Sequence, residues 1–437
     1  MQQSIWHKSV NLPEFPSLQE NLKTDVLVIG GGLCGILCGY YLQQAGVPCV
    51  IAEGNRICSG TSGNTTAKIT SQHGLIYQKL IQDFGKNMAQ MYLLANEKAL
   101  SEYKRLCQNI DCDFAEKPAY TYSTLDRVKL EEEVKAVNSL GFSASFTEKI
   151  PLPFPTKGAV CFPAQAQFHP LKFVASLAKG LPILEHTFVR EIRNGIAITD
   201  QGKIYAKKII VCTHFPFINT HGAYFLKLYQ HRSYVSAFSG APDLDGMYVD
   251  EDKKGLSFRN TGNTLLIGGG GHRTGKPSGA WHHIEDFAKT HYPDAKETYR
   301  WAAQDCMSLD DIPYIGAYSK NTPDLYVATA FNKWGITSSM VAANLLTDMI
   351  LDKKNDFADL FSPQRSILKP QLLVNGFEST KNLLTPAKKR CPHLGCALKW
   401  NPAEHSWDCP CHGSRFTKDG KLIDNPAMGD LQTQKDH

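Results

Sequence analysis

The sequence predicts a mixed α/β fold: an α/β domain built on a parallel sheet, an α+β domain beside it and a small all-β module at the C-terminus. Three observations support this prediction. An apolar strand, a glycine-rich turn, a helix and a second strand follow one another near the N-terminus. The middle of the chain mixes helical stretches with strand-like ones. The last fifty residues contain a compact group of cysteines and histidines.

Length and composition restrict the protein class. The 437 residues are enough for two or three domains, and 42% of them are hydrophobic while 20% are charged, as in ordinary globular proteins. A net charge of +5 is too small to indicate a nucleic-acid partner. No apolar run is long enough to span a membrane, and the N-terminus has no apolar signal core. We therefore expect a cytoplasmic protein whose scattered cysteines are reduced core thiols.

The N-terminal pattern predicts a dinucleotide site. Residues 25–30 form an apolar run typical of a buried parallel strand, 33–45 are helical in pattern, and a second strand ends at Glu53. Between strand and helix stands a G-x-G-x-x-G motif made of Gly30, Gly32 and Gly35. The motif alone also fits a tight turn. With the strands, the helix and the terminal acid in place, it indicates a Rossmann-like fold that holds a pyrophosphate at the helix N-terminus and a ribose on Glu53.

The loop after Glu53 identifies the dinucleotide. It resembles the E-x-x-R-x-x-S-G-x-S-G loop of the D-amino-acid oxidase and glycine oxidase superfamily of FAD enzymes, and the stretches 208–213, 301–316 and 325–337 are similar to later segments of that superfamily. Gly268–Gly271 lacks a third glycine, so no separate NAD(P)H site is expected. The resemblance implies FAD-binding residues along much of the chain. They are Gly30, Gly32, Gly35, Glu53, Arg56, Ser59, Thr61, Thr66, Ala67, Thr213, Gly316, Trp334, Gly335, Ile336 and Thr337.

The substrate side departs from this superfamily. Its amino-acid oxidases commonly carry an arginine that grips the substrate carboxylate, at the position of Gln304 or Asp305 here. Asp305 would repel a carboxylate and attract an amine. Arg259 and Arg232 are alternative anion grips, or else ordinary ion-pair partners.

His73 follows the flavin loop and is the candidate catalytic histidine, together with Arg259. It is interpreted as a proton acceptor at the flavin, as a covalent flavin anchor, or as a hydrogen-bonded core histidine. A general base is not required, since neutral amines can reduce a flavin directly.

The FAD-binding domain is expected to be discontinuous, made of residues 22–80, 155–215 and 300–360. Residues 81–154 and 216–299 would form an α+β substrate domain, which the resemblance implies is similar to that of amino-acid oxidases. Residues 361–385 are expected to link it to a C-terminal module at 386–437, as a packed strap or a flexible tether.

The C-terminal module contains a C-x-H and a C-x-x-H motif. Four metal ligands are expected: Cys391, His393, Cys409 and His412. They suit a Rieske 2Fe-2S cluster, in which two thiolates hold one iron and two imidazoles the other. A structural zinc site is the alternative, but the C-x-H spacing is too short for most zinc sites.

The same motifs resemble the Rieske proteins of the cytochrome bc type. The resemblance implies a disulfide between Cys396 and Cys411, and a hydrogen bond from Ser414 to a cluster sulfur that raises the potential. A tyrosine common in that family is replaced by Phe416, which predicts a lower potential. The stretch before Cys391 is short, so we expect the rest of the chain to cover the cluster.

These features predict an FAD-dependent dehydrogenase for a small amine or amino-acid-like substrate. Electrons would pass from flavin through the Rieske cluster to an external partner such as a ferredoxin or quinone. The alternatives are a ferredoxin-driven flavin reductase and a non-catalytic electron-transfer protein. A Rieske oxygenase is not favoured, because the chain shows no two-histidine, one-carboxylate iron site.

Overall fold

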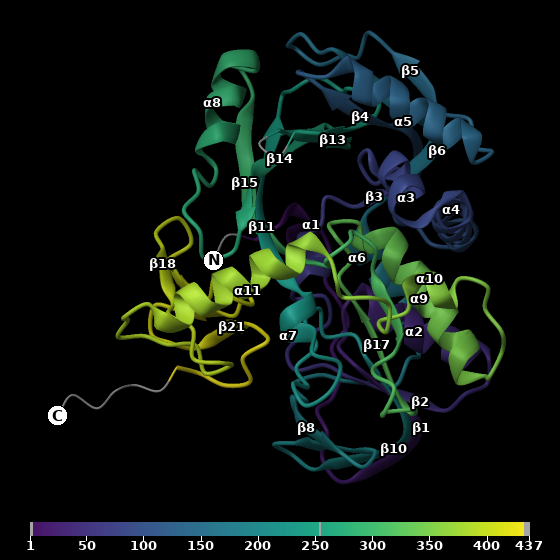
Figure 1. Cartoon of the computed structure of the whole chain (residues 1–437), viewed down its shortest axis with the longest axis vertical. Coiled ribbons are helices and arrows are strands. Elements are labelled where there is room, and N and C mark those ends of the chain that lie inside the picture. The colour runs from purple at the N-terminus through teal and green to yellow at the C-terminus, as the bar shows by residue number, and fades with distance from the viewer. Residues whose placement is uncertain (1–2, 253–254, 432–437) are drawn as a thin grey trace.

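A computed structural model describes residues 3–252 and 255–431. Three sheets organise the described chain, and the smallest lies to one side of the other two (Figure 1). In this part of the chain no helix is long and apolar enough to cross a membrane.

The first sheet is mostly parallel and has the order β16-β17-β10-β1-β2-β7. Off this path, β9 pairs with β10, and β8 pairs with β9. Its strands are β1 (Leu22–Ile29), β2 (Cys49–Ala52), β7 (Ile183–Leu184), β8 (Val189–Arg193), β9 (Ile196–Thr199), β10 (Lys203–Val211), β16 (Tyr314–Ala317) and β17 (Leu325–Thr329). Helices α2 (Leu33–Gln44), α6 (Pro170–Ala178) and α9 (Gly335–Ile350) contribute to the apolar core over this sheet. Strands β1, β2, β10 and β17 run parallel, so their carboxyl ends meet at one edge.

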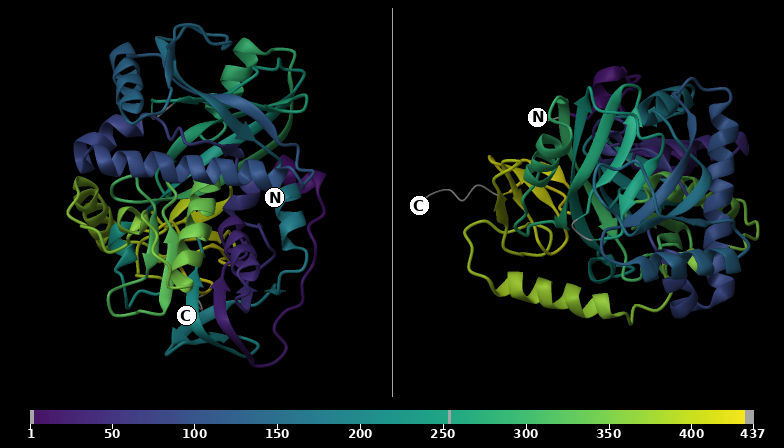
Figure 2. Two further views of the ribbon diagram at one scale, coloured as in Figure 1. Left: turned by 90° about the vertical axis from the view of Figure 1, so that its right-hand side faces the viewer. Right: turned by 90° about the horizontal axis from the view of Figure 1, so that it is seen from above.

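The second sheet is largely antiparallel and has the order β15-β11-β14-β13-β12-β4-β6-β3, with β5 paired to β6. Its strands are β3 (Lys68–Ile69), β4 (Ala115–Ser123), β5 (Ser145–Thr147), β6 (Gly158–Gln167), β11 (Tyr229–Ser239), β12 (Met247–Asp250), β13 (Ser257–Thr261), β14 (Thr264–Arg273) and β15 (Lys296–Met307). The helices near it are α3 (Ile76–Phe84), α4 (Lys86–Cys107), α5 (Arg127–Ser139) and α8 (His282–His291). The long helix α4 crosses the middle of the molecule in the left view of Figure 2.

Three stretches expected in the FAD-binding domain belong to this second sheet instead. Residues 68–69 form β3, which pairs with β6, and residues 158–167 form β6, which also pairs with β4. Residues 300–307 are the larger part of β15, which pairs with β11. The strands β6 and β15 are long and carry the chain from one sheet to the other, so a boundary at 155 falls just before a strand and a boundary at 300 falls inside one.

The C-terminal module is a four-stranded antiparallel sheet of three-residue strands: β18 (Lys399–Asn401), β19 (Ser406–Asp408), β20 (Arg415–Thr417) and β21 (Leu422–Asp424). The expected linker contains α11 (Pro370–Leu384) after α10 (Ala358–Phe361), and polar contacts fix α11 to the body as a strap. The remaining short elements are α1 (Ile5–Ser9), the 3-10 turn η1 (Thr61–Asn64) and α7 (Tyr224–Lys227).

Candidate functional site: a dinucleotide cavity beside a Cys-His cluster

The glycine loop lies where β1 meets α2, against the end of β10. Gly30 has a φ of +110°, and a Cβ atom there would stand 2.6 Å from the Cys212 carbonyl oxygen. A Cβ atom on Gly35 would stand 1.8 Å from the Gly30 carbonyl oxygen. Only glycine fits these two positions, and the close packing brings the N-terminus of α2 to the cavity, where its free N–H groups suit a pyrophosphate.

Glu53 holds the glycine loop by hydrogen bonds. One carboxylate oxygen accepts from the Gly31 N–H at 2.6 Å and the other from the Asn55 N–H at 2.8 Å. Burial raises the pKa of Glu53, although these two N–H groups oppose the rise. The side chain lines the cavity, in the position from which a carboxylate meets a ribose.

The loop from Arg56 to Thr66 closes over the helix N-terminus. Ser62 Oγ accepts from the Leu33 N–H at 2.9 Å, and Thr61 Oγ1 donates to the Gln304 carbonyl at 2.9 Å. Arg56 pairs with the buried Glu185, whose carboxylate also accepts from the Ile57 N–H. The loop is therefore fixed to both sheets.

One cavity of about 2290 Å³ runs from the glycine loop, between the two sheets, to the C-terminal module. This volume exceeds that of a site for a small molecule alone and suits a dinucleotide plus a substrate. Eleven of the residues predicted to bind FAD line it: Gly30, Gly32, Glu53, Arg56, Ser59, Thr61, Thr66, Thr213, Trp334, Gly335 and Ile336.

Four predicted FAD residues do not line the cavity. Gly35 packs the helix on the strand, and Gly316 lies on the edge strand β16 against Pro363. The Ala67 carbonyl accepts from a buried arginine, and Thr337 Oγ1 donates to the Thr70 carbonyl at 3.1 Å. These residues shape the walls and do not face the cavity.

That buried arginine is Arg259, and the structure corrects its expected role as an anion grip. Its guanidinium donates to the Thr66 carbonyl at 2.8 Å and to the Ala67 carbonyl at 2.6 Å, and it lies over the ring of Trp6. It does not line the cavity. Arg259 is thus a positioning residue for the flavin loop.

His73 matches its core-histidine interpretation. Its Nδ1 is 2.7 Å from the Tyr92 hydroxyl, its Nε2 is 2.9 Å from the Thr70 carbonyl oxygen, and its ring stacks on Trp334 at 4.8 Å. Burial lowers the pKa of His73 to about 3. The ring borders the cavity, but both nitrogens are occupied, which leaves none for a substrate proton.

Asp305, expected from the sequence to meet an amine, has a charged neighbour on the cavity wall that sequence reasoning missed, Lys333. Asp305, Lys333 and His214 all line the cavity. Burial raises the pKa of Asp305, a rise that Lys333 opposes, and burial lowers the pKa of Lys333 and of His214. His214 and Lys333 are not glycines, yet their φ angles are positive, at 65° and 73°. The sequence gives no sign of this backbone conformation.

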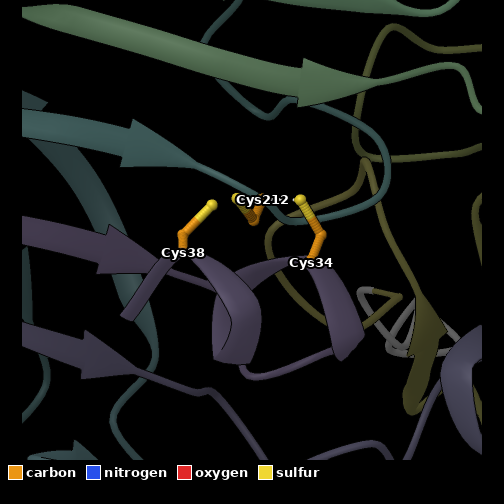
Figure 3. A group of neighbouring side chains, drawn as sticks. All are labelled: Cys34, Cys38 and Cys212. Carbon is orange, nitrogen blue, oxygen red and sulfur yellow. Dashed lines mark hydrogen bonds between the residues drawn. The ribbon is translucent and has the colours of Figure 1, made fainter. Parts of the chain in front are cut away.

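Three thiols lie directly behind the glycine loop. Cys34 and Cys38 on α2 point toward Cys212 at the end of β10, and Cys34 Sγ is 3.6 Å from Cys212 Sγ (Figure 3). Contact with Cys34 and burial raise the pKa of Cys212 well above its usual range. All three cysteines are buried and form no disulfide, and Cys34 and Cys212 also border the cavity.

The two cluster loops converge at the C-terminal module. Cys391 and Cys409 are buried beside each other, and contact with Cys409 lowers the pKa of Cys391 to about 7. The rings of His393 and His412 lie 4.9 Å apart. Their Nδ1 atoms are buried and have no hydrogen-bond partner among the described residues, whereas their Nε2 atoms bond to Asn219 Oδ1 and to the Phe225 carbonyl. Two free imidazole nitrogens beside two thiols fit an iron pair.

Two further residues support these loops. Cys396 and Cys411 form a disulfide that joins the loops, as the bc-type resemblance implied. Ser414 is buried, lies against Cys391 and accepts from the Ala427 N–H at 3.0 Å.

The body of the chain covers the histidine edge of the cluster site. Gln230 Nε2 donates to the His412 carbonyl at 3.0 Å, and Gln304 Nε2 donates to the Gly413 carbonyl at 2.8 Å. Phe215 meets both histidine rings edge-on. Gln304, one of the two residues expected at the position of a carboxylate-binding arginine, thus holds a cluster loop.

Comparison with known proteins agrees with both the dinucleotide site and the Cys-His site. Residues 25–349 match the model of the FAD-dependent oxidoreductase (DAO) family, and residues 362–435 match the Rieske [2Fe-2S] domain. The Bacillus subtilis (strain 168) protein YhfW, named as a Rieske 2Fe-2S iron-sulfur protein, is 34% identical over 98% of this chain and 97% of its own length.

Solved structures share the fold of the larger part. Glycine oxidase from Geobacillus kaustophilus superposes with a TM-score of 0.66 at 21% identity, over 79% of this chain and 100% of its own. L-proline dehydrogenase from P. horikoshii superposes with a TM-score of 0.67 at 17% identity, over 80% and 98%.

Proposed function

Because this chain belongs to the FAD-dependent oxidoreductase (DAO) family and ends in a Rieske [2Fe-2S] domain, we propose that it is a dehydrogenase for a small amine or amino-acid-like substrate. When bound, FAD takes two electrons from the substrate and the cluster passes electrons singly to an external acceptor.

One observation carries this proposal: a single loop after β10 lines the dinucleotide cavity and also contacts the two histidines of the cluster site. Thr213, His214 and Phe217 line the dinucleotide cavity. Between them, Phe215 contacts the rings of His393 and His412. Asn425 of the C-terminal module donates to the Thr213 carbonyl at 2.8 Å and to the Phe215 carbonyl at 2.7 Å, which holds the loop against the module. A shared, buried loop favours electron transfer within the chain.

The cavity wall supports an amino-acid-like substrate. Asp305 and Lys333 present opposite charges, so an ammonium group can approach the first and a carboxylate the second. Lys333 supplies the positive charge that the Gln304 position lacks. His214 stands beside them, and burial lowers its pKa, so its imidazole is neutral and adds no charge to this wall.

The proposal is tested by anaerobic visible spectroscopy of the holoprotein. A panel of amines and amino acids is added, and in a separate arm a reduced ferredoxin. We expect one class of amine to bleach the flavin first and the cluster afterwards. Bleaching by ferredoxin alone, cluster first, would contradict the proposal and indicate a reductase.

A matched variant isolates the role of the cluster. His412→Ala removes an imidazole ligand but leaves the cavity wall unchanged. It should keep substrate bleaching of the flavin and lose reduction of a one-electron acceptor. Unchanged acceptor reduction would show that electrons leave the flavin directly.

A further inference from the structure

Helix α11 is inverted relative to an ordinary surface helix. Its buried side chains are polar, Asn375 and Asn382, whereas large apolar side chains point outward. Leu373 is 77% exposed, Phe377 67% and Leu384 78%. The helix lies along the outer edge of the molecule in the right view of Figure 2.

Specific polar contacts fix this orientation. Asn375 Oδ1 accepts from Arg273 Nη1 at 3.0 Å, and Glu378 pairs with Lys276 at 2.6 Å. The Asn382 carbonyl accepts from the Ala397 N–H at 3.0 Å. Turning the helix to bury its leucines would break all three contacts, so the outward apolar face is built into the fold.

Such a face needs a cover, because a contiguous apolar patch in water is unfavourable and marks an interaction surface. Leu383, on the same helix, approaches Gly395 of the first cluster loop. The preceding residue of that loop, Leu394, is itself 40% exposed. The patch therefore extends from α11 to the loop that carries His393.

The segment that carries the patch is basic. Residues 364–390 contain six Lys and Arg residues and a single acid, Glu378. Glu378 is paired with Lys276, and Arg365 with Asp310. The five other cations of this stretch form no ion pair within 4 Å among the described residues: Lys369, Lys381, Lys388, Lys389 and Arg390. Lys369 lies over the ring of Phe84, Lys389 lies over that of Trp407, and Arg390 donates to the Leu383 and Gly395 carbonyls.

An apolar helix face flanked by cations fits the surface of an anionic bilayer, which accepts side chains among its acyl chains and attracts Lys and Arg to its headgroups. An acidic protein would match the same charges and the same apolar face, and it is the occupant that an absence of lipid binding in the test below would favour. Fifteen residues rise about 22 Å, too short to span the bilayer and long enough to lie in its surface.

We propose that α11 and Leu394 form an interfacial anchor that binds the protein to anionic lipid membranes. The anchor places the His393 loop at the bilayer surface. Under the proposed function, on which only this last step rests, the external acceptor is then a lipid-soluble two-electron carrier of the quinone class.

The test is co-sedimentation of the full-length holoprotein with vesicles of phosphatidylcholine alone or mixed with phosphatidylglycerol. We expect binding to the mixed vesicles that weakens with salt, and at least tenfold weaker partitioning for Phe377→Glu/Leu384→Glu. The matched control is Leu125→Glu/Val128→Glu, which changes two side chains 72% and 62% exposed at the start of α5. This control should bind like the wild type.

Absence of binding to the mixed vesicles at low salt, or equal binding by both double variants, would overturn the proposal. So would a wild-type dimer in solution that Phe377→Glu/Leu384→Glu converts to a monomer, since a second copy would then cover the face. Amine bleaching of the flavin should be unchanged in both double variants without vesicles, so failure of the anchor is distinguishable from failure of the dehydrogenase function.

Discussion

Glu404 is the residue whose replacement most directly tests how the Rieske module is held. It receives two hydrogen bonds from Arg232 on β11, one of 2.7 Å from Nε, and one of 2.9 Å from Arg415 Nη2. Although burial opposes ionisation, the two arginines lower the pKa of Glu404 from 4.5 to about 2. That fall corresponds to about 3 kcal/mol of stabilisation of the charged form.

Glu404→Gln keeps the shape and removes the charge. We expect the module to lose about 3 kcal/mol of stability at pH 7, within the range for a broken buried ion pair. With a urea dependence of roughly 1–3 kcal/mol per M, the midpoint for loss of the cluster's visible circular dichroism should fall by about 1–3 M. The matched control, Glu148→Gln, breaks a surface pair with Arg127 and should shift the midpoint little.

The pH dependence has a defined sign. A carboxylate with a lowered folded pKa stabilises fully above its unfolded value and loses that contribution as pH falls toward the folded value. The difference between wild type and Glu404→Gln should therefore be constant above pH 4.5 and shrink between 4.5 and about 2. A midpoint shift no larger than that of Glu148→Gln, or a difference that grows on acidification, would refute this reasoning.

Three further outcomes are expected. Gly30→Ala, whose Cβ would stand 2.6 Å from a carbonyl oxygen, should lower FAD content at least tenfold, measured as flavin absorbance per protein after gel filtration. Cys396→Ser opens the disulfide and should speed cluster loss under urea at least several-fold, followed by visible absorbance, whereas equal loss rates would exclude a structural role for the bond. Lys333→Met should raise the KM for a carboxylated amine at least tenfold and leave that for a simple amine unchanged; equal effects on both substrates would argue against a carboxylate grip.

The sequence predicts the cofactor residues well where they stand in one continuous motif. Gly30, Gly32 and Glu53 lie along a single strand-turn-helix-strand unit, so their spacing alone determines where they meet. The cluster motifs are local in the same sense, because each loop supplies one cysteine and one histidine.

The sequence does not predict which residues from distant strands lie close together in the fold. Lys333, Asp305 and His214 approach one another only because β10, β15 and β17 end at the same cavity. Arg259 was a candidate anion grip because the usual carboxylate-binding arginine is absent, yet the carbonyls it meets belong to residues 192 and 193 positions earlier. Its partners cannot be read from its neighbours in sequence.

The docking of the Rieske module has a consequence for the rate of electron transfer. Gln230 and Gln304 of the body donate to carbonyls of the second cluster loop, and Asn425 of the module donates to a carbonyl of the body. Under the proposed function, the cluster would therefore be a stationary relay, and no domain would have to move between donor and acceptor. The rate between the two redox centres should consequently be insensitive to solvent viscosity, and only the final encounter with the acceptor should depend on diffusion.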